Sequence, residues 1–259
     1  MISILEEVIK GVRNKESIAL VIIVDVSGSS PGKLGSKMVV NKDGLIAGTI
    51  GGGSVEAKVI EEAKLALKAE KAKFLTYQLT KEEASLEDWM ICGGSLKLFI
   101  DVFTPQEEMV IFGAGHIAMV LSKFAKMIGF RVTIIDERKE FANKERFPEA
   151  DQIIISGPSQ ALKEIKSFNS VYVVILTRGH LKDEEALLSV INYQPKYIGM
   201  IGSKQKNTII FQHLKEKGVN QEKIDKVFAP IGLRIGAQTP EEIAISIIAE
   251  VIKVKRGKS

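Results

Sequence analysis

The chain has 259 residues, of which 45% are hydrophobic and 26% are charged, and its formal net charge at pH 7 is +4. This composition is that of a globular protein with a sizeable core, and the length fits one large domain or two small ones. The single cysteine excludes an intrachain disulfide, which favours a cytoplasmic protein. We expect no nucleic-acid or membrane binding, because the sequence lacks aromatic residues interleaved with basic ones and any apolar run of membrane-spanning length.

The first hundred residues predict a mixture of strands and helices. Ser3 followed by Glu6 forms a capping box, which predicts a helix that starts at Ile4. The dipeptide Asp43–Gly44 between apolar segments predicts a tight hairpin turn. Apolar residues at helical spacing over Val55–Leu67 predict a second helix. The expected strands of this half cover residues 17–25, 37–40, 45–47, 74–78 and 95–102.

A linker at Thr104–Gln106 separates this half from one with a more regular pattern. Strands alternate with helical stretches, which predicts a parallel sheet with helices on both faces. Thr239 and Glu242 form the capping box of the last helix. The expected fold class is α/β, with a small mixed α/β N-terminal domain over residues 1–104 and a Rossmann-like parallel-sheet domain over residues 107–259. The strands of this second domain are expected at residues 109–112, 132–135, 152–155, 171–176 and 197–201.

A glycine-rich turn follows the first strand of the second domain. Gly113 and Gly115 belong to a G-x-G-x-x-A sequence that ends at Ala118. Gly113 permits the tight turn, Gly115 lets the backbone approach a pyrophosphate, and Ala118 lets the helix lie close to the strand. The pattern predicts a phosphate-bearing ligand, and the alternative is a Rossmann-like fold whose site is empty. The apolar face of the following helix is expected to consist of Ile117, Leu121, Phe124 and Ile128.

Three side chains near this turn bear on the identity of the ligand. Asp136 follows the second strand of the domain, where an acidic residue binds the hydroxyl pair of a ribose. Arg138 is close enough in sequence to accommodate a 2′-phosphate instead. His116 lies in the first helical turn, where it either contacts a phosphate or faces solvent. The sequence leaves these alternatives open.

The N-terminal domain contains two further glycine-rich segments. Gly51, Gly52 and Gly53 lead through Ser54 into a helix whose open N-terminus suits an oxyanion or a phosphate. The alternative is a sterically demanding loop that binds nothing. Cys92 precedes two glycines, and is either an inert buried side chain or a reactive thiol that contacts a metal.

Several polar residues follow strands of the second domain, where a parallel sheet presents side chains to its ligand crevice. Arg178 and His180 follow the fourth strand, Ser203 and Lys204 follow the fifth, and Arg234 lies in the loop before the last helix. We expect the cationic side chains among them to gather over the glycine-rich turn, which would suit a polyanionic ligand. The alternative for each of these residues is an ordinary surface position that binds no ligand.

These segments, in this order, resemble the XdhC/CoxI family of xanthine dehydrogenase accessory proteins. The resemblance covers nearly the whole chain. It implies a maturation factor that binds molybdenum cofactor (molybdopterin) as cargo, protects it while a terminal sulfur is installed, and delivers it to a xanthine dehydrogenase-type enzyme. The segments that carry the resemblance are Ser30–Gly32, Gly48–Glu56, Cys92–Gly94, Phe112–Ala118, Asp136–Ala142, Thr177–His180, Tyr197–Ser203 and Pro230–Glu241.

The resemblance also implies partners and a metal ligand. The partners are an apo molybdenum hydroxylase and the cysteine desulfurase that supplies the sulfur, and such proteins are expected to form homodimers. Ser54 stands where the family often has cysteine, and a hydroxyl is a poorer molybdenum ligand than a thiolate. Cys92 would therefore contact the molybdenum of the bound cofactor alone. Arg234 stands where the family often has an acidic residue, which would alter the ligand preference.

Two other functions fit the same residues. The first is an NAD(P)-dependent oxidoreductase, for which His180 is the plausible proton donor at a strand end. The second is a nucleotide-sensing regulatory module in which the Rossmann-like half controls a partner surface. Hydride transfer would identify the oxidoreductase, whereas nucleotide binding without turnover would fit the regulatory module or the maturation factor.

Overall fold

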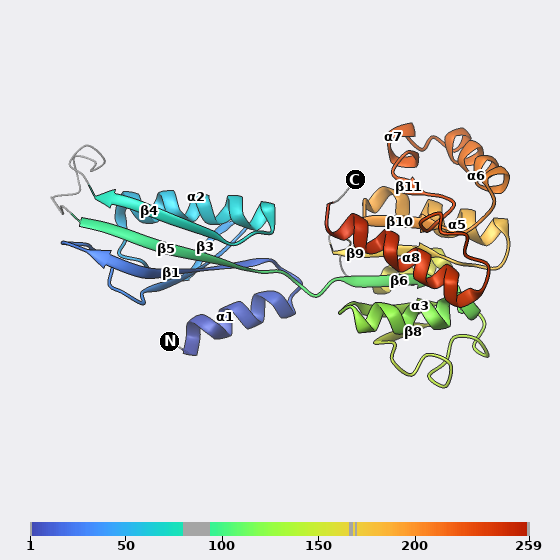
Figure 1. Cartoon of the computed structure of the whole chain (residues 1–259), viewed down its shortest axis with the longest axis horizontal. Helices are drawn as coiled ribbons and strands as arrows, with labels where there is room; N and C mark the ends of the chain where they lie inside the picture. Colours follow the sequence, from blue (N-terminus) through green and yellow to red (C-terminus); the bar gives the residue numbers. More distant parts are fainter. Residues whose placement is uncertain (1, 80–93, 166–167, 169, 258–259) are drawn as a thin grey trace. The chain divides into compact units, whose positions relative to one another are not determined.

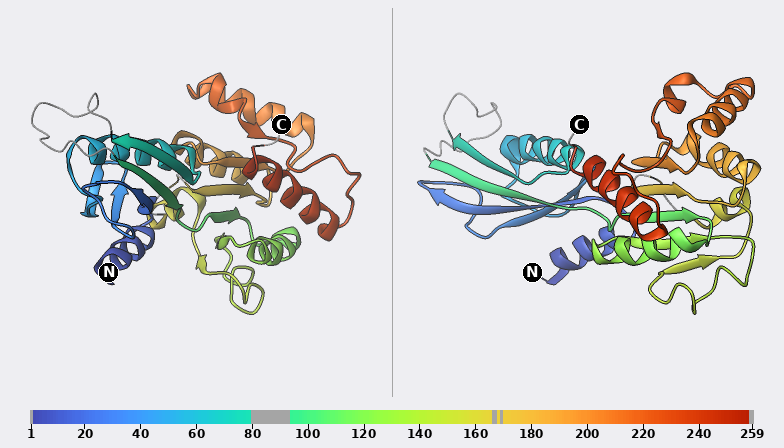
Figure 2. Two further views of the ribbon diagram at one scale, coloured as in Figure 1. Left: turned by 60° about the vertical axis from the view of Figure 1, so that its left-hand side comes forward. Right: turned by 45° about the vertical axis from the view of Figure 1, so that its right-hand side comes forward.

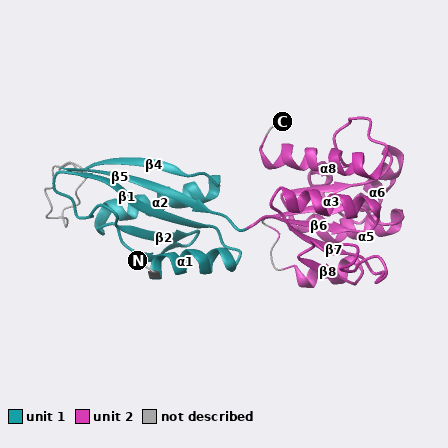
Figure 3. Ribbon diagram, turned by 60° about the horizontal axis from the view of Figure 1, so that its bottom comes forward, with its two compact units in different colours: residues 1–105 teal, residues 106–259 magenta. Residues whose placement is uncertain are grey.

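The computed structural model describes residues 2–79, 94–165, 168 and 170–257. The chain forms two compact units, residues 1–105 (unit 1) and residues 106–259 (unit 2), which Figure 3 shows in two colours. Within the described ranges, no helix is both long enough and apolar enough to cross a membrane.

Unit 1 is built on a five-stranded antiparallel sheet and two helices (Figure 1). Its elements are α1 (Ile2–Arg13), β1 (Ile18–Ser27), β2 (Lys37–Asn41), β3 (Gly44–Gly48), α2 (Gly53–Ala69), β4 (Lys73–Leu79) and β5 (Gly94–Phe103). The strand order is β3-β2-β1-β5-β4. Helix α2 covers one face of the sheet because Val59, Ala63 and Leu67 recur at helical spacing and are buried against it. Helix α1 packs on the other face through Val8, which contacts the cluster around Ile18.

Unit 2 is built on a six-stranded parallel sheet with helices on both faces (Figure 2). Its strands are β6 (Glu108–Phe112), β7 (Arg131–Ile135), β8 (Gln152–Ile154), β9 (Val171–Ile175), β10 (Tyr197–Met200) and β11 (Val227–Phe228). Its helices are α3 (His116–Met127), α4 (Pro158–Ala161), η1 (Leu162–Glu164), α5 (His180–Val190), η2 (Ile191–Tyr193), α6 (Lys204–Glu216), α7 (Gln221–Ile224) and α8 (Pro240–Lys255). The central strands β6 and β9 are buried on both faces, which explains their continuous apolar sequences.

The strand order of unit 2 positions its ligand crevice. The order β8-β7-β6-β9-β10-β11 is that of a Rossmann fold, in which the direction of strand addition reverses between the first and fourth strands. Alternate residues of β6 face opposite layers: Met109 and Ile111 pack against α3 and α8, whereas Val110 and Phe112 pack against the helices of the other face. Ligands of such sheets bind beyond the carboxyl ends of the strands at the reversal, which here lies between β6 and β9.

The predicted fold class is confirmed, and the observed ends of the predicted strands lie within two residues of their expected positions. The start of the first helix was predicted wrongly. Helix α1 begins at Ile2, so Ser3 already has helical backbone and is not the N-cap. Packing of Ile4 and Val8 on the sheet stabilises this end of the helix, whereas the capping pattern reports only local preference.

The buried face of α3 agrees with the prediction at Ile117, Leu121 and Phe124, which all belong to the core of unit 2, and differs at the end of the helix. The helix ends at Met127, and Ile128 is 37% exposed. The residues fully buried against the sheet include Ala118 and Ala125, because small side chains let the helix axis approach the strands. Strand β11 was not predicted, since two residues are too few to show a periodic pattern.

Candidate functional site

The glycine-rich turn joins β6 to α3 at the reversal of strand order. Gly113 has a φ of 104°, and a Cβ atom there would lie 2.3 Å from the carbonyl oxygen of Leu176, so the position requires glycine. Gly115 is the N-cap of α3, and no side chain caps this helix. Apart from Gly115 itself and its two chain neighbours, no described atom lies within 4 Å of the place where a Cβ on Gly115 would stand. The amides of the first turn of α3 are therefore open to an anionic ligand.

Asp136, at the end of β7, is tied to the turn and to Arg138. Its Oδ1 accepts hydrogen bonds from the backbone N–H (3.0 Å) and the Nε–H (2.9 Å) of Arg138. Its Oδ2 accepts from the Ala114 N–H (2.8 Å) and from Nη2 of Arg138 (2.7 Å). Burial raises the pKa of Asp136, but these hydrogen bonds outweigh burial and hold the pKa below its usual value. The carboxylate is therefore charged, and its four acceptor positions are occupied by the chain itself.

Two arginines and a phenylalanine support this arrangement. The Arg138 guanidinium lies over the ring of Phe141, 4.1 Å from its centroid, and the Arg146 guanidinium lies 5.1 Å from the same centroid. Arg146 also donates to the carbonyl oxygen of Ala114 at 3.2 Å. Asp136 and Arg146 thus hold the N–H and the C=O of Ala114, which fixes the turn before any ligand binds. Sequence reasoning missed Arg146, because no motif spacing links it to a turn 32 positions away.

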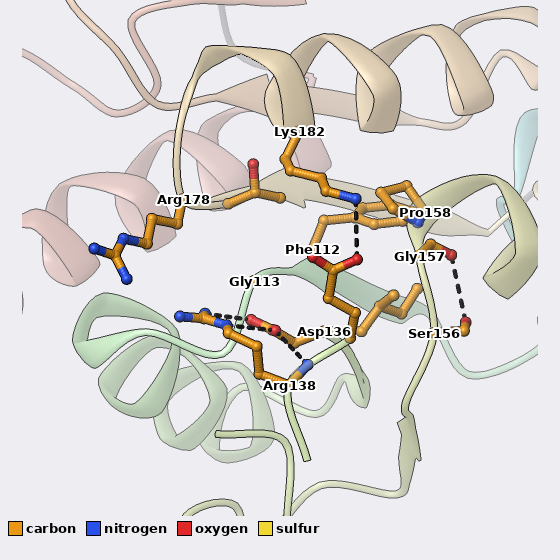
Figure 4. Close-up of a pocket in the computed structure, with 12 residues that line it drawn as sticks. Phe112, Gly113, Asp136, Arg138, Ser156, Gly157, Pro158, Arg178 and Lys182 are labelled. Carbon is orange, nitrogen blue, oxygen red and sulfur yellow. Dashed lines mark hydrogen bonds and ion pairs between the residues drawn. The ribbon is translucent and has the colours of Figure 1, made fainter. Parts of the chain in front are cut away.

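Two cavities flank the turn. The first, of about 250 Å³, lies beyond the ends of β6, β7 and β8 and reaches Pro158. The second, of about 520 Å³, lies beside His116 on α3 and reaches Pro240 at the start of α8. Arg138 and Arg178 line both cavities. Figure 4 shows their guanidinium groups at one end of the first cavity, with Lys182 farther along it. The volume of the second cavity is in the range of small-molecule sites, and that of the first lies just below it.

The predicted cationic crevice is formed only in part. Arg178 lines both cavities beside the turn, and His116 lines the second cavity. The other polar residues predicted at strand ends are exposed and line neither cavity: His180, Ser203, Lys204 and Arg234. The Ser203 hydroxyl accepts a hydrogen bond from the Lys206 N–H and so caps α6. That helix end therefore has its own acceptor and is less available to a ligand than the uncapped end of α3.

A buried carboxylate in the first turn of α5, the helix that follows β9, was not predicted. Asp183 is fully buried and accepts hydrogen bonds from Lys206 Nζ at 2.6 Å and from Thr177 Oγ1 at 2.5 Å. Lys206, and not Lys204, is thus the lysine held at this edge of the sheet. Two positions along a helix rotate a side chain by about 200°, so the strand-end pattern alone does not distinguish the two lysines.

The glycine-rich loop of unit 1 binds a carboxylate of its own chain. Gly51, Gly52 and Gly53 all have positive φ values, which explains the run of glycines. Glu56 Oε2 accepts hydrogen bonds from the N–H groups of Ile50 (2.9 Å) and Gly52 (3.1 Å) and from the Thr49 hydroxyl (2.5 Å). The sequence predicts an oxyanion or phosphate ligand at this loop, whereas in the structure the loop amides bind the carboxylate of a residue four positions beyond Gly52. Ser54 follows at the start of α2 and is partly buried.

The predicted metal contact at Cys92 lies outside the described residues. Within the described ranges, no three or more histidine, cysteine, aspartate and glutamate side chains are grouped so as to hold a metal ion.

Comparisons with protein families match both units. The family model described as the XdhC Rossmann domain matches residues 109–251, and the model of the XdhC and CoxI family matches residues 12–78. A crystal structure of a protein described as a xanthine dehydrogenase, from Bacillus halodurans, superposes with a TM-score of 0.55 at 23% identity, covering 98% of this chain and 96% of that one. At that identity the likeness shows the fold.

Three curated relatives are similar in sequence. The uncharacterized protein YqeB of Escherichia coli is 36% identical over 92% of this chain and 44% of its own length. A Bacillus subtilis protein named as a probable subunit of xanthine dehydrogenase is 30% identical over 61% of this chain and 46% of its own length. The molybdenum cofactor insertion chaperone PaoD of E. coli is 22% identical over 98% of this chain and 88% of its own length. The chain thus spans less than half the length of the first two relatives.

Proposed function

Because the chain belongs to the XdhC and CoxI family, we propose that it binds the molybdenum cofactor and serves in the maturation of a molybdenum hydroxylase. Two relatives support this role by name: PaoD is a molybdenum cofactor insertion chaperone, and the B. subtilis relative is a probable subunit of xanthine dehydrogenase. The client is then an apo molybdenum hydroxylase, and a xanthine dehydrogenase is the candidate that these names favour.

The observation that carries the proposal is the uncapped, glycine-rich turn of unit 2 between two cavities. The cofactor is a pterin that carries a phosphate, or a diphosphate joined to a nucleoside. The first-turn amides of α3 have no side-chain cap and would suit such a phosphate, and Arg138 and Arg178 add positive charge beside them. Gly113, Gly115 and His116 are the other unit 2 residues that we assign to binding.

The finer steps of the role are part of the same proposal. The protein holds the cofactor while a cysteine desulfurase installs the terminal sulfur, and then delivers the sulfurated form to the apo-enzyme as a homodimer. Burial in a preformed crevice would keep the cofactor from water during this interval. Cys92 is assigned to this step on the resemblance described above, with its thiolate toward the molybdenum. The segment from Gly51 to Ser54 is not assigned to it, because the Glu56 carboxylate already accepts hydrogen bonds from this loop.

Direct titration tests the proposal. Purified full-length chain is mixed with molybdenum cofactor released from a donor enzyme, and bound molybdenum and bound pterin are measured after gel filtration. We expect uptake that approaches one molybdenum per binding site, activation of an apo-hydroxylase by the loaded protein, and loss of uptake in Arg178→Met. Lys139→Met is the matched control, because it removes an exposed charge beside the site without lining either cavity. Absence of uptake by the unmodified chain would refute the proposal.

An oxidoreductase is the competing function for the same turn. Its expected proton donor, His180, is exposed and lines neither cavity, so the geometry favours binding over hydride transfer. The same titration run with NADH and NADPH separates the two functions, because tight dinucleotide binding with turnover and no molybdenum uptake would identify the oxidoreductase.

A further inference from the structure

The carboxylate of Asp136 occupies the position at which a Rossmann fold usually binds ribose hydroxyls. In this protein each of its oxygens already accepts two hydrogen bonds, over distances of 2.7–3.0 Å. A carboxylate offers about four acceptor positions, so a ribose hydroxyl would have to displace Arg138 or the Ala114 N–H. The side chain of Asp136 is 7% exposed, which leaves little of its surface for a ligand.

Arg138 has the opposite property, because its donors are only partly used. Its Nε and Nη2 atoms each donate to Asp136, while a guanidinium carries five N–H groups in a fixed plane. The plane is held by this bidentate ion pair on one edge and by the ring of Phe141 on one face. The remaining N–H groups are therefore preorganised and available to an anion.

Arg178 supplies a second guanidinium at the same end of the first cavity (Figure 4). It is exposed, and within the described part of the chain it has no ion-pair partner. By contrast, Lys182, farther along the cavity, is paired with Glu137 at 2.9 Å. Two cations with free donors thus flank the uncapped start of α3, and Asp136 holds one of them, Arg138, through hydrogen bonds.

We infer that Asp136 is a positioning residue that does not bind ribose hydroxyls. It holds Arg138 in place, so that Arg138 and Arg178 together bind the diphosphate of a nucleotide-type ligand over the glycine-rich turn. The two positive charges match the two negative charges of a bridging diphosphate. A cavity lies on each side of the turn, so the ligand class is a dinucleotide, with a nucleoside in the first cavity and a second group in the second. The inference deepens the proposed function, on whose nucleotide-type ligand it rests.

Nucleoside phosphates are the probes for this inference. Binding of the mono- and diphosphates of adenosine, guanosine and cytidine to the full chain is measured by calorimetry. We expect at least one diphosphate to bind about tenfold or more tightly than its monophosphate, because each guanidinium adds charge-assisted hydrogen bonds to the second phosphate. The 2′,3′-dideoxy form of that diphosphate should bind within about twofold of the ribose form, since a hydrogen bond to Asp136 would be worth more than that.

A double-mutant cycle tests the positioning role. Arg138→Met should bring diphosphate binding close to that of the monophosphate, and Asp136→Asn, which keeps an acceptor for the Ala114 N–H, should weaken diphosphate binding severalfold. Because Asp136 acts through Arg138, the double variant should bind like Arg138→Met alone. Lys139→Met is the control for removal of a nearby positive charge, and circular dichroism confirms that each variant is folded.

Each alternative result has a distinct meaning. Equal binding of all mono- and diphosphates, or additive effects in the double variant, would overturn the inference. The dideoxy form could instead bind the unmodified chain more weakly than the ribose form, with no such difference in Asp136→Asn. That result would show that Asp136 binds the ribose hydroxyls. Molybdenum cofactor uptake by the same preparation is measured separately. Uptake without diphosphate preference refutes the inference alone, whereas diphosphate preference without uptake refutes the proposed function and leaves the inference standing.

Discussion

The Glu56 carboxylate in unit 1 offers a sharp test of how the glycine-rich loop is held. Glu56→Ala removes one acceptor that receives hydrogen bonds from the Ile50 N–H, the Gly52 N–H and the Thr49 hydroxyl. A hydrogen bond to a charged group contributes about 1.5–3 kcal/mol. All three share one oxygen, and the loop is partly exposed, so water replaces part of the loss. We therefore expect the variant to lose about 2 kcal/mol of unfolding free energy.

Two measurements check this expectation. Urea unfolding followed by circular dichroism gives the change in stability, and hydrogen exchange of peptides covering residues 49–56 reports the amides of Ile50 and Gly52 directly. Glu61→Ala is the control, because Glu61 lies on the same helix and its exposed carboxylate forms a surface pair with Lys64 at 2.8 Å. Such a pair is worth less than about 1 kcal/mol. Unchanged protection of both amides in Glu56→Ala would refute the cradle.

The same carboxylate has a predictable pH dependence. Burial raises the pKa of Glu56, but hydrogen bonds from Thr49, Ile50 and Gly52 outweigh burial and lower it below the usual value. A carboxylate with a lowered folded-state pKa stabilises the fold at pH values above its unfolded pKa of about 4.3. That contribution is lost as the pH falls through the folded-state pKa. The difference between the unfolding midpoints of wild type and Glu56→Ala should therefore be constant near neutral pH and shrink as the pH falls below about 4, and a difference that stays constant down to acid pH would contradict the assignment.

Three further predictions concern unit 2. Gly113→Ala should abolish nucleoside diphosphate binding and lower the free energy of unfolding by more than about 2 kcal/mol, because its Cβ would lie 2.3 Å from the Leu176 oxygen at positive φ. A variant that binds the diphosphate as wild type does in calorimetry would disprove this prediction. Tyr197→Phe should cost about 1–3 kcal/mol in urea unfolding, because the buried Tyr197 hydroxyl donates to Glu250 at 2.6 Å, whereas exposed Tyr193→Phe should be neutral. Burial raises the pKa of Asp151, but its hydrogen bonds lower it overall, so Asp151→Asn should destabilise at pH 7, by an amount that shrinks as the pH falls below about 4.

Much of the architecture follows from local pattern. The run of apolar residues in β6, the glycines at 113 and 115, and the helical spacing after them are sufficient to predict a strand, a turn and a helix. The capping box at Thr239 predicts the start of α8, and both of its reciprocal hydrogen bonds are present. These features depend on residues within about one helical turn of each other, so the amino-acid sequence is sufficient to predict them.

The candidate site is different, because its key contacts join residues that are distant in sequence. Asp136 and Ala114 are 22 positions apart, and Arg146 and Ala114 are 32 apart. The strand order places β7 and β9 on either side of β6, and only then do the ends of these strands share a crevice. No periodic pattern in the sequence predicts that strand order.

The sequence by itself determined the two-part α/β organisation, the Rossmann turn and the family resemblance. The tertiary structure alone decided which polar groups are still available to a ligand. The glycine-rich loop of unit 1 and the acid after β7 both have the composition of ligand sites, yet Glu56 occupies the first and Arg138 pairs with the second. A ligand must compete with such internal partners, and their presence depends on distances that three-dimensional packing sets.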